Sequence, residues 1–404
     1  MFPENDIIKV RKLANQMMEH ALSDEFEARR NRWRDVNSRQ KPDRAPVWCG
    51  LAGVSRELFP PETLECTDPI CRRVEDVFRR HLYKCWVGDD EVFNPWWSVP
   101  AVFDCSTEYP FGLPTHVSVG TTEKGGFKYH HPIKSVDDYE KITIPEYSYN
   151  ETETKSRIAR LSDLLGEVMP VRMSGAPPLT PNHSVYLEQL RGMEPMLGDL
   201  AFYPSTVHRA MAKITEGVLG AMRAAEEAGI LTTNNTLPMT CSDPLEDDGG
   251  TKTGLNGLWC IANSQEFQMV SPAMHQEFLL NYQMPCMQQY GAVQYGCCED
   301  LTQKIDIVKS IPNLRVFVCS YWTDLEKLLA TCGNAYTIMW RQLSAHVMLP
   351  DELIGVENDL SFGARKLQGS SYQIILREVE TLGGHPDRLK EWAGIAINAA
   401  EQFS

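Results

Sequence analysis

Two adjacent cysteines and two acids form the densest group of reactive side chains in this 404-residue chain, in the stretch QYGCCED at residues 294–300. Thiolates and carboxylates are ligands of zinc. Two neighbouring thiols can also form a redox pair, and small residues at a strand end can simply fill a core. The spacing matches no CxxC or zinc-finger pattern. Three interpretations therefore stay open: a metal site of Cys297, Cys298 and Glu299, a redox pair, or structural residues with Glu299 at a helix N-terminus.

Three further side chains are candidates for chemistry because each stands near the end of a predicted strand or the start of a predicted helix. His275 is a candidate acid or base, and an exposed surface position explains it as well. Arg172 and Arg341 are candidates for binding a substrate carboxylate, because a guanidinium that faces inward needs an anionic partner. A solvated strand end explains either arginine equally well.

These residues must be positioned by eight short β-rich segments. Most of these segments are followed by a segment of helical period. Strand–helix alternation predicts a parallel sheet, and eight strands predict a closed (β/α)8 TIM barrel. Functional residues of such a barrel lie at the C-terminal ends of its strands. Adjacent cysteines on a strand point to opposite sides, so only one of the pair is expected to face the barrel axis. The predicted strands are 45–49, 171–175, 230–233, 267–270, 292–296, 314–320, 335–340 and 372–376.

The whole chain, 1–404, is expected to form one barrel domain with a helical N-terminal segment at 1–44. A long insertion follows the first strand. Its part at 85–150 is rich in Trp, Phe, Pro and Gly and predicts irregular strands and loops over one end of the barrel. Such an aromatic lid can exclude water from a small-molecule site. A subsidiary core or a dimer contact is the equally good alternative.

Composition excludes several classes of partner. The net charge of −15 and the absence of basic patches argue against nucleic acid. No apolar run is long enough for a membrane span and the N-terminus has no signal-peptide pattern, so a cytoplasmic protein is expected. Most of the 12 cysteines are then expected to be free thiols.

The order SPAMHQEFLLNYQMP, VQYGCCEDL and IPNLRVFVCSYWTDLEKLLATCG resembles the second half of the uroporphyrinogen decarboxylase superfamily. The resemblance extends through VRMSGAPP to the C-terminal YQIILREVETLGG and implies a (β/α)8 barrel, commonly homodimeric. True uroporphyrinogen decarboxylases carry an Arg-Gln-Ala-Gly-Arg-like loop where this chain reads VWCGLAGVSREL. The chain is therefore similar to the branch of methyltransferases that pass methyl groups to a corrinoid-binding partner protein.

This resemblance implies roles for particular residues. Thiol-alkylating members bind zinc through a His-any-Cys motif and a later Cys. Here Tyr295, Gly296 and Cys297 stand at the motif, without its histidine, and the C-terminal loop offers Glu380 but no cysteine. Cys297, Cys298 and Glu299 would hold zinc or donate a proton, and Tyr295 would polarise a leaving oxygen.

The implied substrate is a small methylated molecule, a methoxy-aromatic or a methylamine-like cation. Besides Arg172 and Arg341, the residues expected to bind it are aromatic. The alternatives are a decarboxylase or other lyase acting on a small carboxylate, and a non-catalytic ligand-binding barrel. The aromatic candidates are Trp96, Trp97, Phe103, Trp259 and Trp322.

Overall fold

A computed structural model describes residues 1–119, 127–245 and 253–404. It is a mixed α/β protein in which strands from both ends of the chain share one sheet. Its strands are β1 (Val47–Cys49), β2 (Trp97–Pro100), β3 (Phe103–Cys105), β4 (His116–Val119), β5 (Phe127–His130), β6 (Tyr147–Tyr149), β7 (Val171–Ser174), β8 (Trp259–Ala262), β9 (Ala292–Tyr295), β10 (Leu314–Cys319), β11 (Thr337–Gln342) and β12 (Tyr372–Leu376).

Helices precede, connect and follow these strands. The first two of them lie within the segment 1–44, where helices were expected. The α-helices are α1 (Glu4–Ala21), α2 (Asp24–Asn37), α3 (Ser55–Leu58), α4 (Pro69–Val87), α5 (Glu151–Leu165), α6 (His183–Arg191), α7 (Met193–Phe202), α8 (Pro204–Glu227), α9 (Pro272–His275), α10 (Asn281–Met287), α11 (Ile305–Val308), α12 (Leu325–Cys332), α13 (Ser344–Met348), α14 (Ile354–Leu367) and α15 (Arg388–Gln402).

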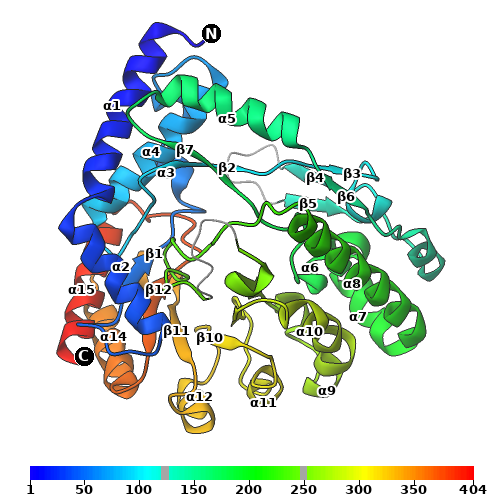
Figure 1. Ribbon diagram of the computed structural model, residues 1–404. Coiled ribbons are helices and arrows are strands. Elements are labelled where there is room, and N and C mark those ends of the chain that lie inside the picture. The colour runs from blue at the N-terminus through cyan, green and yellow to red at the C-terminus, as the bar shows by residue number, and fades with distance from the viewer. Residues whose placement is uncertain (120–126, 246–252) are drawn as a thin grey trace.

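The main sheet is a six-stranded parallel sheet in the order β1, β12, β11, β10, β9, β8. It curls as a half-barrel, and Figure 1 shows α9 to α12 following one another along its outer side. Side chains alternate between its faces. Val316, Val318, Met339 and Ile375 pack with Trp33 of α2 in one cluster, whereas Phe317 and its outward-facing neighbours join the helices in the large core. The parallel sheet was predicted correctly, but the full eight-stranded barrel is not confirmed.

Six of the eight predicted strand segments contain strands. The segment 230–233 contributes only a single bridge at Thr232. The prediction at 267–270 is wrong, because Phe267 ends a 3-10 helix, Gln265–Phe267, and Met269 is exposed. The strand lies earlier, at β8, where Trp259 and Cys260 are buried and Ile261 is half exposed. Short apolar runs do not by themselves distinguish a strand from a buried turn.

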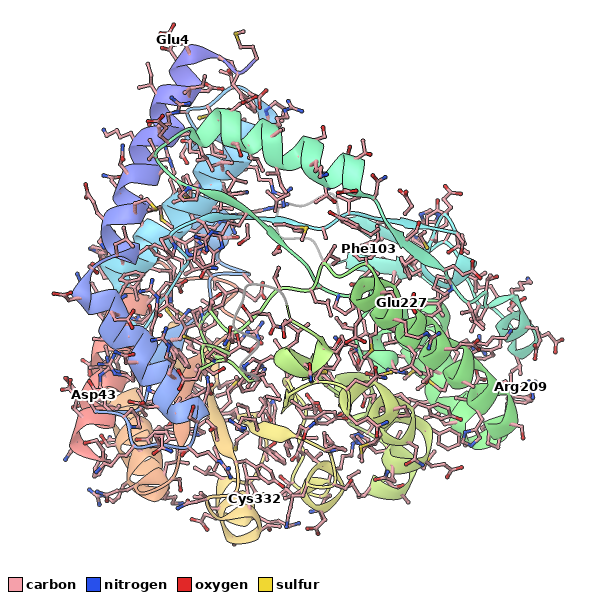
Figure 2. The ribbon with its side chains drawn as sticks, in the orientation of Figure 1. Glu4, Asp43, Phe103, Arg209, Glu227 and Cys332 are labelled. Carbon is pink, nitrogen blue, oxygen red and sulfur yellow. The ribbon has the colours of Figure 1, made fainter. Side chains whose placement is uncertain are left out.

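The predicted insertion contains a long helix, α4, and then strands that pair outside the main sheet. β2 runs parallel to β7, β3 pairs antiparallel with β6, and β4 pairs antiparallel with β5. Part of the predicted lid, residues 120–126, lies outside the described residues. Figure 2 shows Phe103 of β3 on the side of the molecule away from Asp43 and Cys332.

Candidate functional site

A glycine turn places the two cysteines beyond the C-terminal end of β9. Gly296 has φ +111°, a conformation that side chains rarely adopt. A Cβ at this position would lie 2.9 Å from Cβ of Val318 on the neighbouring strand. Because the chain leaves the strand at this glycine, the alternation of side chains stops before Cys297. Both thiols can therefore face the same direction, contrary to the expectation that only one would face inward.

Both thiols contact one buried cation. Sγ of Cys297 lies 3.6 Å from Sγ of Cys298. Nη1 of Arg341, on β11, lies 3.7 Å from the first sulfur and 3.8 Å from the second. The same Nη1 lies 3.3 Å from Oε1 of Glu378, in the loop after β12. The structure thus brings together residues that follow or end three different strands, which we call the thiol site: Cys297, Cys298, Arg341 and Glu378.

The pKa values of the two thiols are shifted in opposite directions. The Cys298 thiol donates a hydrogen bond to Cys297, and Arg341 adds its positive charge, so the pKa of Cys297 falls to about 6 despite burial. The same hydrogen bond, together with burial, raises the pKa of Cys298 above its ordinary range. Cys297 is therefore a thiolate, which is the form of cysteine that attacks electrophiles and binds metals.

The donor set fits a zinc ion. One ligand atom each from Cys297, Cys298 and Glu378 lies within 4.8 Å of the others. Two sulfurs on one tetrahedral zinc are about 3.8 Å apart, given Zn–S bonds of about 2.3 Å, which is close to the 3.6 Å between these sulfurs. Three protein ligands leave a fourth position open, as in catalytic zinc sites. Arg341 now places its positive charge among these ligands, so a bound zinc ion requires its guanidinium to move aside.

Glu299, the carboxylate predicted to join the cysteines, has both of its oxygens bonded to other groups. Its Oε1 accepts hydrogen bonds from the backbone N–H and the hydroxyl of Ser264, at 2.8 and 2.9 Å. Its Oε2 accepts the backbone N–H of Cys297 at 2.7 Å. Glu299 is completely buried. This carboxylate ties the turn after β9 to the segment after β8, and Glu378 takes its place beside the thiols.

Tyr295 and His275, predicted as catalytic residues, form a buried network on the outer face of β9. The Tyr295 hydroxyl donates to Oε1 of Gln283 and lies 3.0 Å from Nε2 of His275. Burial lowers the pKa of His275 to about 3, so its ring is neutral at pH 7. Burial also raises the pKa of Tyr295. Tyr295 belongs to the large core with the helices, so it points away from the face on which Arg341 lies.

The predicted substrate-binding residues other than Arg341 do not gather at the thiol site. Trp259 is buried in the cluster that contains Trp33, and its indole N–H donates to the Ser242 hydroxyl at 3.1 Å. Trp322 is 58% exposed. Phe103 packs against Tyr149. Trp96, Trp97 and Arg172 lie together on another wall of the molecule, where the guanidinium of Arg172 stacks over Trp96 at 4.2 Å.

Two polar residues, one in a loop and one in a strand, were not singled out from the sequence. Glu378 is the first acid after β12, and only its position two residues beyond a buried strand could have pointed to it. It has φ +56°, a strained conformation for a residue with a side chain. Gln294 lies in β9 one residue before Tyr295, and its Oε1 is buried without a hydrogen-bond partner among the described residues, as is Nε of Arg341. Unpartnered buried polar atoms of this kind are typical of sites that bind something.

No protein-family model and no curated protein sequence matches the chain. Among solved structures, a methyltransferase from Methanosarcina mazei has a similar fold, with a TM-score of 0.52. The match covers 93% of this chain and 98% of that chain at 12% sequence identity. At this identity the likeness shows a shared fold alone. Among the described residues, no helix combines the length and apolar character that crossing a membrane requires.

Proposed function

We propose that this protein is a methyltransferase that moves a methyl group from a small methylated substrate to a corrinoid held by a separate partner protein. The observation that carries the proposal is the thiol site: a thiolate, a protonated thiol and a carboxylate around one cation, beyond the C-terminal ends of parallel strands. Functional groups of such α/β folds lie at that end of the sheet. The similarity of the fold to that of a methyltransferase supports the reaction class.

The residues of the thiol site have distinct tasks in this proposal. Cys297, Cys298 and Glu378 would hold zinc, which acts as a Lewis acid on the leaving oxygen, nitrogen or sulfur. When the methyl group passes to the corrinoid, the electron pair of the broken bond stays on the leaving atom. The leaving atom then takes a proton. Solvent supplies that proton, because Cys298 as a zinc ligand would be a thiolate. Arg341 stabilises the negative charge that develops nearby.

We also propose that the half-barrel is part of a closed eight-stranded barrel and that the enzyme is a homodimer in the cytoplasm. The segment 230–235 supports closure, because it is bonded to strands on both sides. The N–H of Thr232 donates to the carbonyl of Gly175, next to β7, at 3.1 Å. The Asn234 side chain accepts from the N–H of Trp259 and donates to its carbonyl, at 2.8 and 2.9 Å.

The test is a methyl-transfer assay with cob(I)alamin supplied in solution and methoxy-aromatics, methylamines and methyl thioethers as donors. We expect methylcobalamin to form with at least one donor class. The Cys297→Ala variant should lose this activity, whereas Cys105→Ala, which removes an exposed thiol on β3, should keep it. No methylcobalamin with any donor class would refute the proposal.

A second function is favoured by one observation. Nε of Arg341 is buried and has no hydrogen-bond partner among the described residues. A substrate carboxylate would satisfy it. This favours a decarboxylase or other lyase on a small carboxylate, in which Arg341 holds the acid. Release of carbon dioxide from a carboxylate substrate, together with no methyl transfer, would identify this alternative.

A further inference from the structure

A cavity of about 360 Å³ lies at the N-terminal ends of β1 and β12. Its size falls in the range of pockets for small molecules, about 300–1,000 Å³. Ser370 and Ser371, directly before β12, line it together with Ala45, which precedes β1. Glu378 of the thiol site lies six residues after Tyr372, the first residue of β12, which is roughly 20 Å along an extended strand. The cavity is therefore separate from the thiol site.

The floor of the cavity is apolar and contains two aromatic side chains. Its buried residues are Val36, Ala45, Tyr372 and Phe403. The hydroxyl of Tyr372 is buried and has no hydrogen-bond partner among the described residues. Burial raises the pKa of Tyr372 to about 12, so this hydroxyl keeps its proton at neutral pH and can donate it to a ligand. An unpartnered donor beside a cavity is typical of a place that binds something.

Exposed amides stand on the rim of the cavity. They are the side chains of Gln40, Asn334 and Gln368. Nδ2 of Asn334 donates to the carbonyl of Gly369 at 3.0 Å, and its Oδ1 has no partner among the described residues. An amide side chain can donate and accept hydrogen bonds at once, which is what the edge of a nucleobase requires.

Two cations on the rim lack an acidic partner among the described residues. Nη1 of Arg39 donates to a backbone carbonyl at 3.1 Å, and neither Arg39 nor Lys41 forms an ion pair in the described part of the chain. Burial, and after it the charge of Arg39, lowers the pKa of Arg315, so another cation lies near Arg39. Arg44 also lines the cavity, but it is already paired with the buried Asp90. Free guanidinium and ammonium groups of this kind bind phosphate.

We propose that this cavity binds a nucleoside monophosphate, with its base against the Tyr372 and Phe403 rings and the amides of the rim, and its phosphate at Arg39 and Lys41. A phosphate accounts for two cations without an acid in a chain whose net charge is −15. A flat base fits an apolar floor that is edged by amides. The inference goes beyond the proposed function, because the cavity and the thiol site lie at opposite ends of the strands.

Isothermal titration calorimetry with adenosine monophosphate (AMP) tests the cavity without any methyl transfer. We expect one binding event per chain, with Kd raised about tenfold or more in Lys41→Ala and in Arg39→Ala, because each removes a charged hydrogen-bond partner. Lys155→Ala, which removes an exposed lysine of α5, is the matched control and should bind as the wild type does. Adenosine, which has no phosphate, should bind the wild type and Lys41→Ala equally.

The carbonyl ends of α2, α14 and α15 reach the cavity and carry partial negative charge, which offers another reason for the two cations. If these helix ends are the whole reason, the wild type should not bind AMP, or Lys41→Ala should bind it equally well. Either result would overturn the inference.

Two further comparisons sharpen the test. Ribose 5-phosphate lacks the base, so we expect it to bind more weakly than AMP. Equally tight binding would show a simple phosphate site and refute the nucleotide. Cys297→Ala should bind AMP with unchanged affinity, because the thiol site is separate. Loss of binding in that variant would contradict the placement of the ligand, whereas the outcome of the methyl-transfer assay has no bearing on it.

Discussion

Two carboxylates flank the thiol pair, and they differ in almost every physical respect. Glu299 is completely buried and accepts three hydrogen bonds, from Ser264 twice and from Cys297. Glu378 is 44% exposed, has a positive φ and contacts the buried Arg341. Adjacency in sequence made Glu299 the predicted ligand, but its oxygens are already bonded. A buried carboxylate whose oxygens already accept hydrogen bonds stabilises the fold. A carboxylate that is accessible and carried by a strained residue is available for a ligand.

The largest effect should come from the thiolate itself. We expect Cys297→Ala to slow methyl transfer by at least about 100-fold, the size of contribution that a positioned catalytic group makes. Its unfolding free energy should change by less than about 1 kcal/mol, since the side chain is only half-buried. Transfer rates and urea unfolding of the same preparations measure both quantities. Activity within a few-fold of the wild type would show that the thiol site takes no part in methyl transfer.

The two carboxylates should respond oppositely to removal. Glu299→Ala leaves the donors of Ser264 and Cys297 without an acceptor, so we expect a loss of about 3 kcal/mol in unfolding free energy. Glu378→Ala should cost clearly less than Glu299→Ala, because its side chain is 44% exposed and Cys297 remains beside Arg341, yet it should impair transfer. Urea unfolding measures both stability losses. Equal losses in the two variants would show that Glu299 and Glu378 do not differ in their contribution to folding.

Alkylation by iodoacetamide should show the low pKa of Cys297 in metal-free protein. Only the thiolate reacts, so the rate should rise with pH through a midpoint near 6 and level off above it. Cys298→Ala removes the hydrogen-bond donor and Arg341→Leu removes the charge. Each should move the midpoint upward, toward the ordinary thiol value of about 8.5. A wild-type midpoint near that ordinary value would contradict the proton arrangement proposed for the thiol site.

The smallest effect should come from the outer face of β9. Tyr295→Phe removes the hydrogen bond to Gln283, so we expect a loss of about 1 kcal/mol in stability and an unchanged rate of methyl transfer. The measurement is again urea unfolding beside the transfer assay. A large loss of rate at constant stability would restore the catalytic role that the sequence suggested for Tyr295.

Much of the fold was predictable because it depends on local patterns. Long buried strands such as β10 and β12, and the helix α8 with its regular apolar spacing, are recognisable from residues within one segment. The strand β8 was missed because its four residues include the half-exposed Ile261, while the apolar residue Phe267 nearby belongs to a turn. Closure of a barrel depends on contacts between distant segments, which no local pattern encodes.

The candidate site was predictable only in part, for a similar reason. The cysteine pair and Arg341 were found because their types and strand-end positions are visible in sequence. Glu378 was missed and Glu299 was predicted instead, because a backbone turn at Gly296 and a positive φ at Glu378, which decide where each carboxylate points, are not visible in the sequence. The sequence separation of 79 residues between the two acids carries no information on which one reaches the sulfurs.

Zinc content is the most direct test of the difference between the two carboxylates. Protein purified with zinc and freed of loose metal should hold about one zinc per chain, measured by mass spectrometry of the metal. Glu378→Gln and Cys297→Ala should retain far less, whereas folded Glu299→Gln should retain the wild-type amount. Wild-type protein that is free of zinc yet fully active, or a folded Glu299→Gln variant that loses zinc as completely as Cys297→Ala, would contradict the account.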